Sequence, residues 1–132
     1  MTISDKINII EEQIQKACLR AGRNRSEITL MGVTKFQTHA LIKEAWKAGI
    51  RFFGESRVQE ALVKYGKEKL NLEDIELHMI GSLQRNKAKT AVGMFDCIQS
   101  VDSEGLIMEL AKHATGREKP LNILFEFRTG ED

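Results

Sequence analysis

I-T-L-M-G-V-T-K, at residues 28–35, is the stretch that decides the fold of this chain. Its apolar and β-branched residues follow one another and do not alternate with polar residues. This pattern predicts a strand that is buried on both faces, as in a parallel sheet. The stretch ends at Lys35, and a short loop then leads to an amphipathic helix from about His39. Because α/β folds bind ligands at the carboxyl ends of their strands, Lys35 is a candidate functional residue.

Two interpretations of Lys35 follow from its place at the end of an apolar strand. A buried lysine has a lowered pKa, and its neutral amine can form a Schiff base with an aldehyde. Alternatively, the side chain extends from the strand end into water and has no chemical role. The stretch by itself leaves both interpretations open.

Length and charge limit the class of protein. The chain has 132 residues, so a single domain over residues 1–132 is expected. Twenty basic and 19 acidic residues leave a net charge of +1, too little to attract nucleic acid or an anionic membrane. No apolar run is as long as a membrane span, and no signal-peptide core follows the N-terminus. We therefore expect a soluble, cytoplasmic protein with neither nucleic-acid nor membrane partners.

The cysteines and histidines do not suggest a metal or a disulfide. Cys18 and Cys97 lie on apolar faces of predicted elements, as small buried hydrophobic residues do in a reducing compartment. His39, His78 and His113 lack the spacing of metal ligands. No structural metal site is expected.

Strand and helix signals alternate along the whole chain. After a helix over residues 4–21, apolar strands are predicted at residues 28–35, 50–54, 75–81, 97–101 and 121–127, with a helix between each pair. Such alternation requires a parallel sheet covered by helices and joined by right-handed crossovers.

Two α/β architectures fit this alternation. Only five residues follow the last predicted strand, whereas a doubly wound sheet would normally end with one more helix. An eight-stranded barrel needs about 250 residues, so this repeat would fill just over half of one. The pattern favours the N-terminal portion of a (β/α)8 TIM-type barrel with about the first five strands. A flavodoxin-like doubly wound sheet is the alternative.

Candidate site residues stand where the predicted strands end. They are Lys35, Ser56, His78 and Ser100. Two of them have a purely structural alternative, since Ser56 can be only a cap of the following helix and His78 can be a hydrogen-bonded core histidine. The chain has no Ser-His-Asp set, no G-x-G-x-x-G motif and no P-loop, so hydride transfer and nucleotide hydrolysis are poorly supported.

Four segments, in this order, resemble the pyridoxal phosphate homeostasis protein family, small relatives of the N-terminal barrel domain of alanine racemase. They are G-V-T-K at 32–35, F-G-E-S-R-V-Q-E at 53–60, H-M-I-G-S-L-Q-R-N-K at 78–87 and T-G-E-D at 129–132. The resemblance implies a barrel that carries pyridoxal 5′-phosphate (PLP) as a Schiff base on Lys35, with Ser56, His78 and Ser100 near the cofactor. It also implies a carrier or regulator of the vitamin B6 pool without established catalytic activity.

The chain departs from the family in two ways. The family often has Asn at the positions of Ser56 and Arg128, so contacts to the cofactor ring are expected to differ. The family also continues past T-G-E-D through three more strands, and its serine- and glycine-rich phosphate-binding loops have no counterpart here. We therefore expect a truncated barrel that has the aldehyde-capturing lysine without the phosphate clamp.

Two other functions stay open at this point. A PLP-dependent racemase-like enzyme would need a second acid or base, usually a tyrosine, but Tyr65 is predicted in a helix away from the strand ends. A cofactor-free half-barrel that pairs with another chain is the second alternative. Full-length relatives are expected to be monomers, whereas this chain is expected to self-associate or to need its missing half.

Overall fold

The computed structural model describes residues 1–66 and 71–130 and has an α/β fold. Five parallel strands form one sheet in the order β1-β2-β3-β4-β5. The strands are β1 (Met31–Val33), β2 (Phe52–Glu55), β3 (Glu76–Met79), β4 (Cys97–Val101) and β5 (Asn122–Phe125). The predicted parallel sheet is therefore confirmed.

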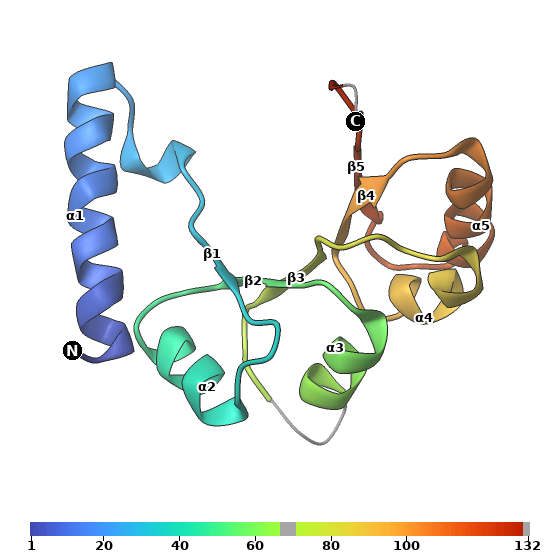
Figure 1. Cartoon of the computed structure of the whole chain (residues 1–132), viewed down its shortest axis with the longest axis horizontal. Helices are drawn as coiled ribbons and strands as arrows, with labels where there is room; N and C mark the ends of the chain where they lie inside the picture. Colours follow the sequence, from blue (N-terminus) through green and yellow to red (C-terminus); the bar gives the residue numbers. More distant parts are fainter. Residues whose placement is uncertain (67–70, 131–132) are drawn as a thin grey trace.

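The helices between the strands lie along one side of the sheet (Figure 1). They are α2 (His39–Lys47), α3 (Val58–Tyr65), α4 (Ala88–Val92) and α5 (Glu104–Ala114), with a short 3-10 turn η2 (Arg85–Lys87) before α4. A flavodoxin-like sheet has the strand order 2-1-3-4-5 and helices on both faces. The flavodoxin-like alternative therefore does not describe this chain.

Helix α1 (Ile3–Ala21) stands beside the β1 end of the sheet (Figure 1). It begins with a capping box in which Thr2 and Asp5 exchange hydrogen bonds, and it ends at Gly22 in the left-handed conformation. The 3-10 turn η1 (Arg25–Glu27) follows, and its first residue pairs with Glu11 of α1 at 2.6 Å. Cys18 is the only fully buried residue of α1, so this helix packs against the rest of the molecule over a small area.

The strand predicted at residues 28–35 is shorter than expected. Hydrogen bonding to the next strand extends as far as the Thr34 N–H, which donates to the Gly54 carbonyl at 3.0 Å. Phe36 then adopts a positive φ of 61°, and the Gln37 N–H closes a turn on the Thr34 carbonyl at 3.0 Å. Lys35 therefore lies in a tight turn just past β1.

The two faces of the sheet are buried unequally, and the outer strands β1 and β5 contain no fully buried residue. Along β3 the pattern alternates, with Leu77 and Met79 buried against the helices and His78 half-buried on the other face. In β1 no residue is fully buried, and Val33 is exposed. The prediction that residues 28–35 are buried on both faces is wrong, because no described helix covers the second face of β1, where Val33 is exposed.

The sequence also led to expectations about the cysteines, membrane-spanning helices and metal sites. Cys18 and Cys97 are buried and free, as predicted. Within residues 1–66 and 71–130, no helix is long and apolar enough to cross a bilayer. In the same ranges, no three His, Cys, Asp or Glu side chains gather as they do in a metal site.

Candidate functional site

The carboxyl ends of the five strands lie along one edge of the sheet because the strands are parallel. Two of the hollows lined by described residues open at this edge. One, of about 340 Å3, is lined by Ser56, Ser82 and Lys87 among others. The second, of about 380 Å3, is lined by Ser82, Asp102 and Arg128 with two neighbours. Ligand sites in α/β folds lie at this kind of edge.

Lys35 is exposed, so its side chain extends from the strand end into water and its amine is not buried as the Schiff-base interpretation assumes. The preceding residue, Thr34, is buried on the side of the sheet that the helices cover. Lys35 is the first residue after it that is exposed to solvent. Its amine makes no hydrogen bond or ion pair with another described residue. A primary amine in this state is accessible to an aldehyde from solvent.

A buried polar network lies directly behind Lys35. The Thr34 hydroxyl donates to Glu55 Oε1 at 2.8 Å, and Lys64 Nζ donates to the same oxygen at 2.9 Å and to Glu60 Oε1 at 2.7 Å. Lys64 Nζ also donates to the Thr34 carbonyl. Its hydrogen bond to Glu60 is the largest cause that lowers the pKa of that carboxyl below its ordinary value. The network ties the end of β1 to β2 and α3.

Tyr65 belongs to this network, which corrects its expected place away from the strand ends. Its hydroxyl lies 2.8 Å from Thr34 Oγ1. Since the Thr34 hydroxyl donates to Glu55, Tyr65 is the donor of this bond. Burial is the main reason that the pKa of Tyr65 is raised above its ordinary value. The side chain comes from α3 on the helix-covered side, and it packs near Phe53 of the core.

Sequence reasoning missed Glu55, Glu60 and Lys64 as parts of the site. Glu60 and Lys64 have the i, i+4 spacing of an ordinary solvated helix pair. Glu55 stood inside a motif that drew attention to its neighbour Ser56 instead. The only sequence signal was a glutamate at the end of an apolar strand, where a buried charge needs a partner.

Ser56 does not cap α3, so that interpretation is wrong. The N-cap residue is Arg57, and no side chain caps the helix. Ser56 instead lies against Gly81, where an added Cβ atom would be only 2.3 Å from the Ser56 carbonyl oxygen. Gly81 thus allows the ends of β2 and β3 to approach closely.

Ser100 is buried in β4, and its hydroxyl is already engaged. It donates to the Gly81 carbonyl at 2.6 Å. Ser56 and Ser100 therefore meet the same residue, Gly81, from the two neighbouring strands. This contact fixes the segment that follows β3 at the edge where the two hollows open.

His78 lies within β3 and not at its end. Its Nδ1 is 3.0 Å from Gln99 Nε2, and its ring stands edge-on to Phe52 at 5.8 Å. Nε2 is buried and has no partner among the described residues. The interpretation as a hydrogen-bonded histidine is confirmed for Nδ1. No hydrogen bond in the described part of the chain joins any two of the four predicted site residues.

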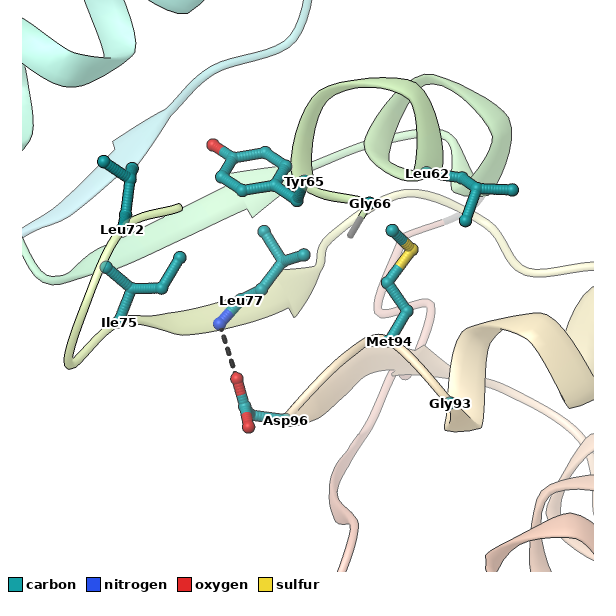
Figure 2. A pocket seen from close by; sticks show the side chains of 9 residues that line it. All are labelled: Leu62, Tyr65, Gly66, Leu72, Ile75, Leu77, Gly93, Met94 and Asp96. Atoms are coloured by element: carbon teal, nitrogen blue, oxygen red, sulfur yellow. Dashed lines mark hydrogen bonds between the residues drawn. The ribbon is translucent and has the colours of Figure 1, made fainter. Parts of the chain in front are cut away.

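Another hollow, of about 460 Å3, lies at the opposite edge of the sheet, near the amino ends of β3 and β4 (Figure 2). Its walls are mostly apolar, and the Leu77 N–H donates to Asp96 Oδ2 at 2.7 Å along one of them. None of the predicted site residues lines this hollow.

The T-G-E-D motif at residues 129–132 is described only in part. Thr129 and Gly130 are exposed, and Glu131 and Asp132 lie outside the described residues.

Curated relatives match the chain along its whole length. No family model matches it. The pyridoxal phosphate homeostasis protein of Aquifex aeolicus is 38% identical over 98% of this chain and 56% of its own length. The proteins of that name from Escherichia coli K12 and Haemophilus influenzae are 32% and 30% identical, again over 56% of their own lengths.

Solved structures give the same result. PipY of Synechococcus elongatus PCC7942 with PLP bound superposes with a TM-score of 0.63 at 43% identity, over 80% of this chain and 48% of PipY. An unknown protein from Bifidobacterium adolescentis gives a TM-score of 0.71 at 25% identity, over 92% and 58% of the two chains. The chain thus spans just over half the length of the curated relatives it matches, and along its whole length it is homologous to the pyridoxal phosphate homeostasis proteins.

Proposed function

We propose that this chain is part of a cytoplasmic protein of PLP homeostasis and that it binds PLP through a Schiff base on Lys35. The observation that carries the proposal is the exposed amine of Lys35, which has no described partner and stands at the carboxyl end of β1. PipY, a structural neighbour, was solved with PLP bound. When bound, PLP supplies an aldehyde that condenses with a primary amine.

The residues present suit the aldehyde end of such a ligand. Lys35 supplies the amine, and the hollow beside Ser56 offers space and hydroxyl groups at the same edge of the sheet. Ser100 is proposed to act through its bond to Gly81, which holds the segment after β3 in place. His78 offers a buried Nε2 atom without a described partner, which supports a role in orienting a polar group.

The same proposal includes the barrel. The five strands are parallel and sequential, and the described helices between them lie on one side of the sheet, as in the first part of a (β/α)8 barrel. In such a barrel the sheet face without helices is the interior. We propose that residues 1–132 are a single domain that forms the N-terminal portion of this barrel.

A racemase-like activity is less well supported. It would need a second acid or base facing Lys35. Tyr65 has its hydroxyl bonded to Thr34 on the helix-covered side of the sheet, where burial raises its pKa. It is therefore poorly placed to exchange protons with a ligand on Lys35.

The test is covalent trapping. The chain is incubated with PLP, reduced with borohydride and digested, and the modified lysine is identified by mass spectrometry. The adduct is expected on Lys35, to disappear in Lys35→Ala and to persist in Lys43→Ala, which removes an exposed lysine of α2. An adduct that persists on another lysine in Lys35→Ala would show that the assignment is wrong.

A further inference from the structure

We propose that Glu60 and Lys64 of α3, together with Glu55 of β2, are positioning residues for Lys35. They hold the backbone on both sides of this lysine, so that its amine is presented in a fixed place to an aldehyde. The inference rests on the proposed function of Lys35, and it assigns to α3 a role that no sequence motif indicated.

The residue before Lys35 is held through every polar group that it has. The Thr34 N–H donates to the Gly54 carbonyl at 3.0 Å. Its hydroxyl lies 2.8 Å from both Glu55 Oε1 and the Tyr65 hydroxyl, and its carbonyl accepts from Lys64 Nζ. Thr34 is also buried. The backbone that enters Lys35 is therefore fixed by contacts from β2 and α3.

The residue after Lys35 is held by the same helix. The Phe36 N–H donates to Glu60 Oε1, although Phe36 has a positive φ of 61°. Left-handed backbone is unfavourable for a bulky residue without a glycine's freedom. The contact with Glu60 supports this conformation, and the turn bond from Gln37 to Thr34 closes it.

Lys64 links the two halves of this arrangement. Its ammonium group has three donors, and it donates to the Thr34 carbonyl, to Glu55 and to Glu60. The side chain is 8% exposed, and Glu55 beside it is fully buried. A hydrogen-bonded ion pair in so little water is strong and rigid. Lys35 itself takes no part, so its amine can react while both neighbours stay in place.

Fixed neighbours matter for the chemistry of a flexible side chain. Lysine has four rotatable side-chain bonds, and the position of its amine depends first on the backbone that carries it. When that backbone is already ordered, less conformational freedom is lost as the amine meets the aldehyde carbon. Loosening the turn should therefore slow the condensation without removing any group that touches the ligand.

The test compares Glu60→Ala with Glu60→Gln. Glu60 is 20% exposed, so neither change leaves a buried cavity. Glutamine keeps a carbonyl oxygen that accepts from Phe36 and Lys64, whereas alanine removes it. Two readouts are taken on the full chain: hydrogen exchange of the Phe36 amide by NMR, and the rate of borohydride-trapped adduct formation on Lys35 with PLP.

In Glu60→Ala we expect faster Phe36 exchange and slower Lys35 labelling, each by about tenfold, the effect of losing the hydrogen bond that holds the Phe36 N–H. Glu60→Gln should restore both rates to near the wild-type values. Glu11→Ala is the matched control, because it breaks a 2.6 Å ion pair between α1 and η1 that is not part of the network around Lys35. It should leave both readouts unchanged.

A second pair of variants tests the same positioning role at another residue, in case Glu60→Ala does not fold. Thr34→Val removes the hydroxyl with little change of shape, and Thr34→Ser keeps it. Labelling should slow in the valine variant only. If Glu60→Ala and Thr34→Val label Lys35 at the wild-type rate, the positioning role is wrong and the proposed function stands. If the wild-type chain gives no Lys35 adduct, both are overturned.

Discussion

Lys64 and Glu55 form a buried ion pair beneath the end of β1, with Nζ of Lys64 2.9 Å from Oε1 of Glu55. The two side chains are 8% and 0% exposed, and Glu55 Oε2 has no partner among the described residues. A buried charge is tolerated only while its partner is present. The pair therefore makes the fold around Lys35 depend on α3.

Removing the positive partner should destabilise the protein strongly. Lys64→Met leaves the Glu55 carboxylate buried and unpaired, so the free energy of unfolding should fall by about 3–5 kcal/mol. Urea denaturation followed by circular dichroism measures this change. The double variant Lys64→Met with Glu55→Met should be more stable than Lys64→Met alone, because no isolated charge remains. A single variant within about 1 kcal/mol of wild type would contradict the argument.

Acid should weaken the same network. The pKa of Glu60 is lowered in the folded state, chiefly by its hydrogen bond with Lys64. A carboxyl group with a lowered folded pKa stabilises the protein above its unfolded pKa, and this contribution is lost as the pH falls through the folded pKa. The free energy of unfolding, measured between pH 7 and pH 3, should therefore decline less steeply in Glu60→Gln than in wild type. The same change at the exposed residue Glu12 is the control, and an equal effect there would count against Glu60 as the source.

Gly81 should not accept a side chain. A Cβ atom there would lie 2.3 Å from the Ser56 carbonyl oxygen and 2.9 Å from its Cα, and neither is a flexible side-chain end. Gly81→Ala should reduce the free energy of unfolding by about 1–3 kcal/mol, as overpacking does. Gly93→Ala is the control, because the nearest atom would be 3.6 Å away and φ is −73°. It should be neutral or stabilising by about 0.4–1 kcal/mol, and equal losses in both would refute the contact argument.

The open edges of the sheet should make the chain self-associate. β1 and β5 are the two edge strands; Phe125 at the end of β5 is 58% exposed, and Phe127, two residues after it, is 79% exposed. Exposed apolar edges favour pairing with another chain. Light scattering coupled to size exclusion should show a mass that rises with concentration, and Phe125→Lys should reduce this rise. Met108→Lys, an exposed position on α5, should not. A constant monomer mass for the wild-type chain would contradict the prediction.

Local sequence signals determined the elements of this fold. β4 occupies Cys97–Val101, the range predicted from its apolar run. Thr2 and Asp5 cap α1, and Ser103 caps α5 by accepting from the Leu106 N–H, as their types and positions predict. These features depend on residues three or four apart, so a short window of sequence contains the interacting groups.

The candidate site was predictable only in part. The alternation of strands and helices places Lys35 and Ser56 at one edge of a parallel sheet, and the motifs carry the resemblance to the PLP homeostasis proteins. Sequence alone does not show that Ser56 meets Gly81 from across the sheet instead of capping α3. That contact depends on the register between β2 and β3, which the local pattern does not specify.

Only the tertiary structure decided the surroundings of Lys35. Lys35 is exposed because the chain turns away from the sheet directly after β1, and Glu55 is paired because Lys64 of α3 lies beside the ends of β1 and β2. The Thr34 hydroxyl meets that of Tyr65, 31 residues further along the chain. Burial and charge pairing are set by which elements pack together, and a chain of alternating strands and helices carries that information in no single segment.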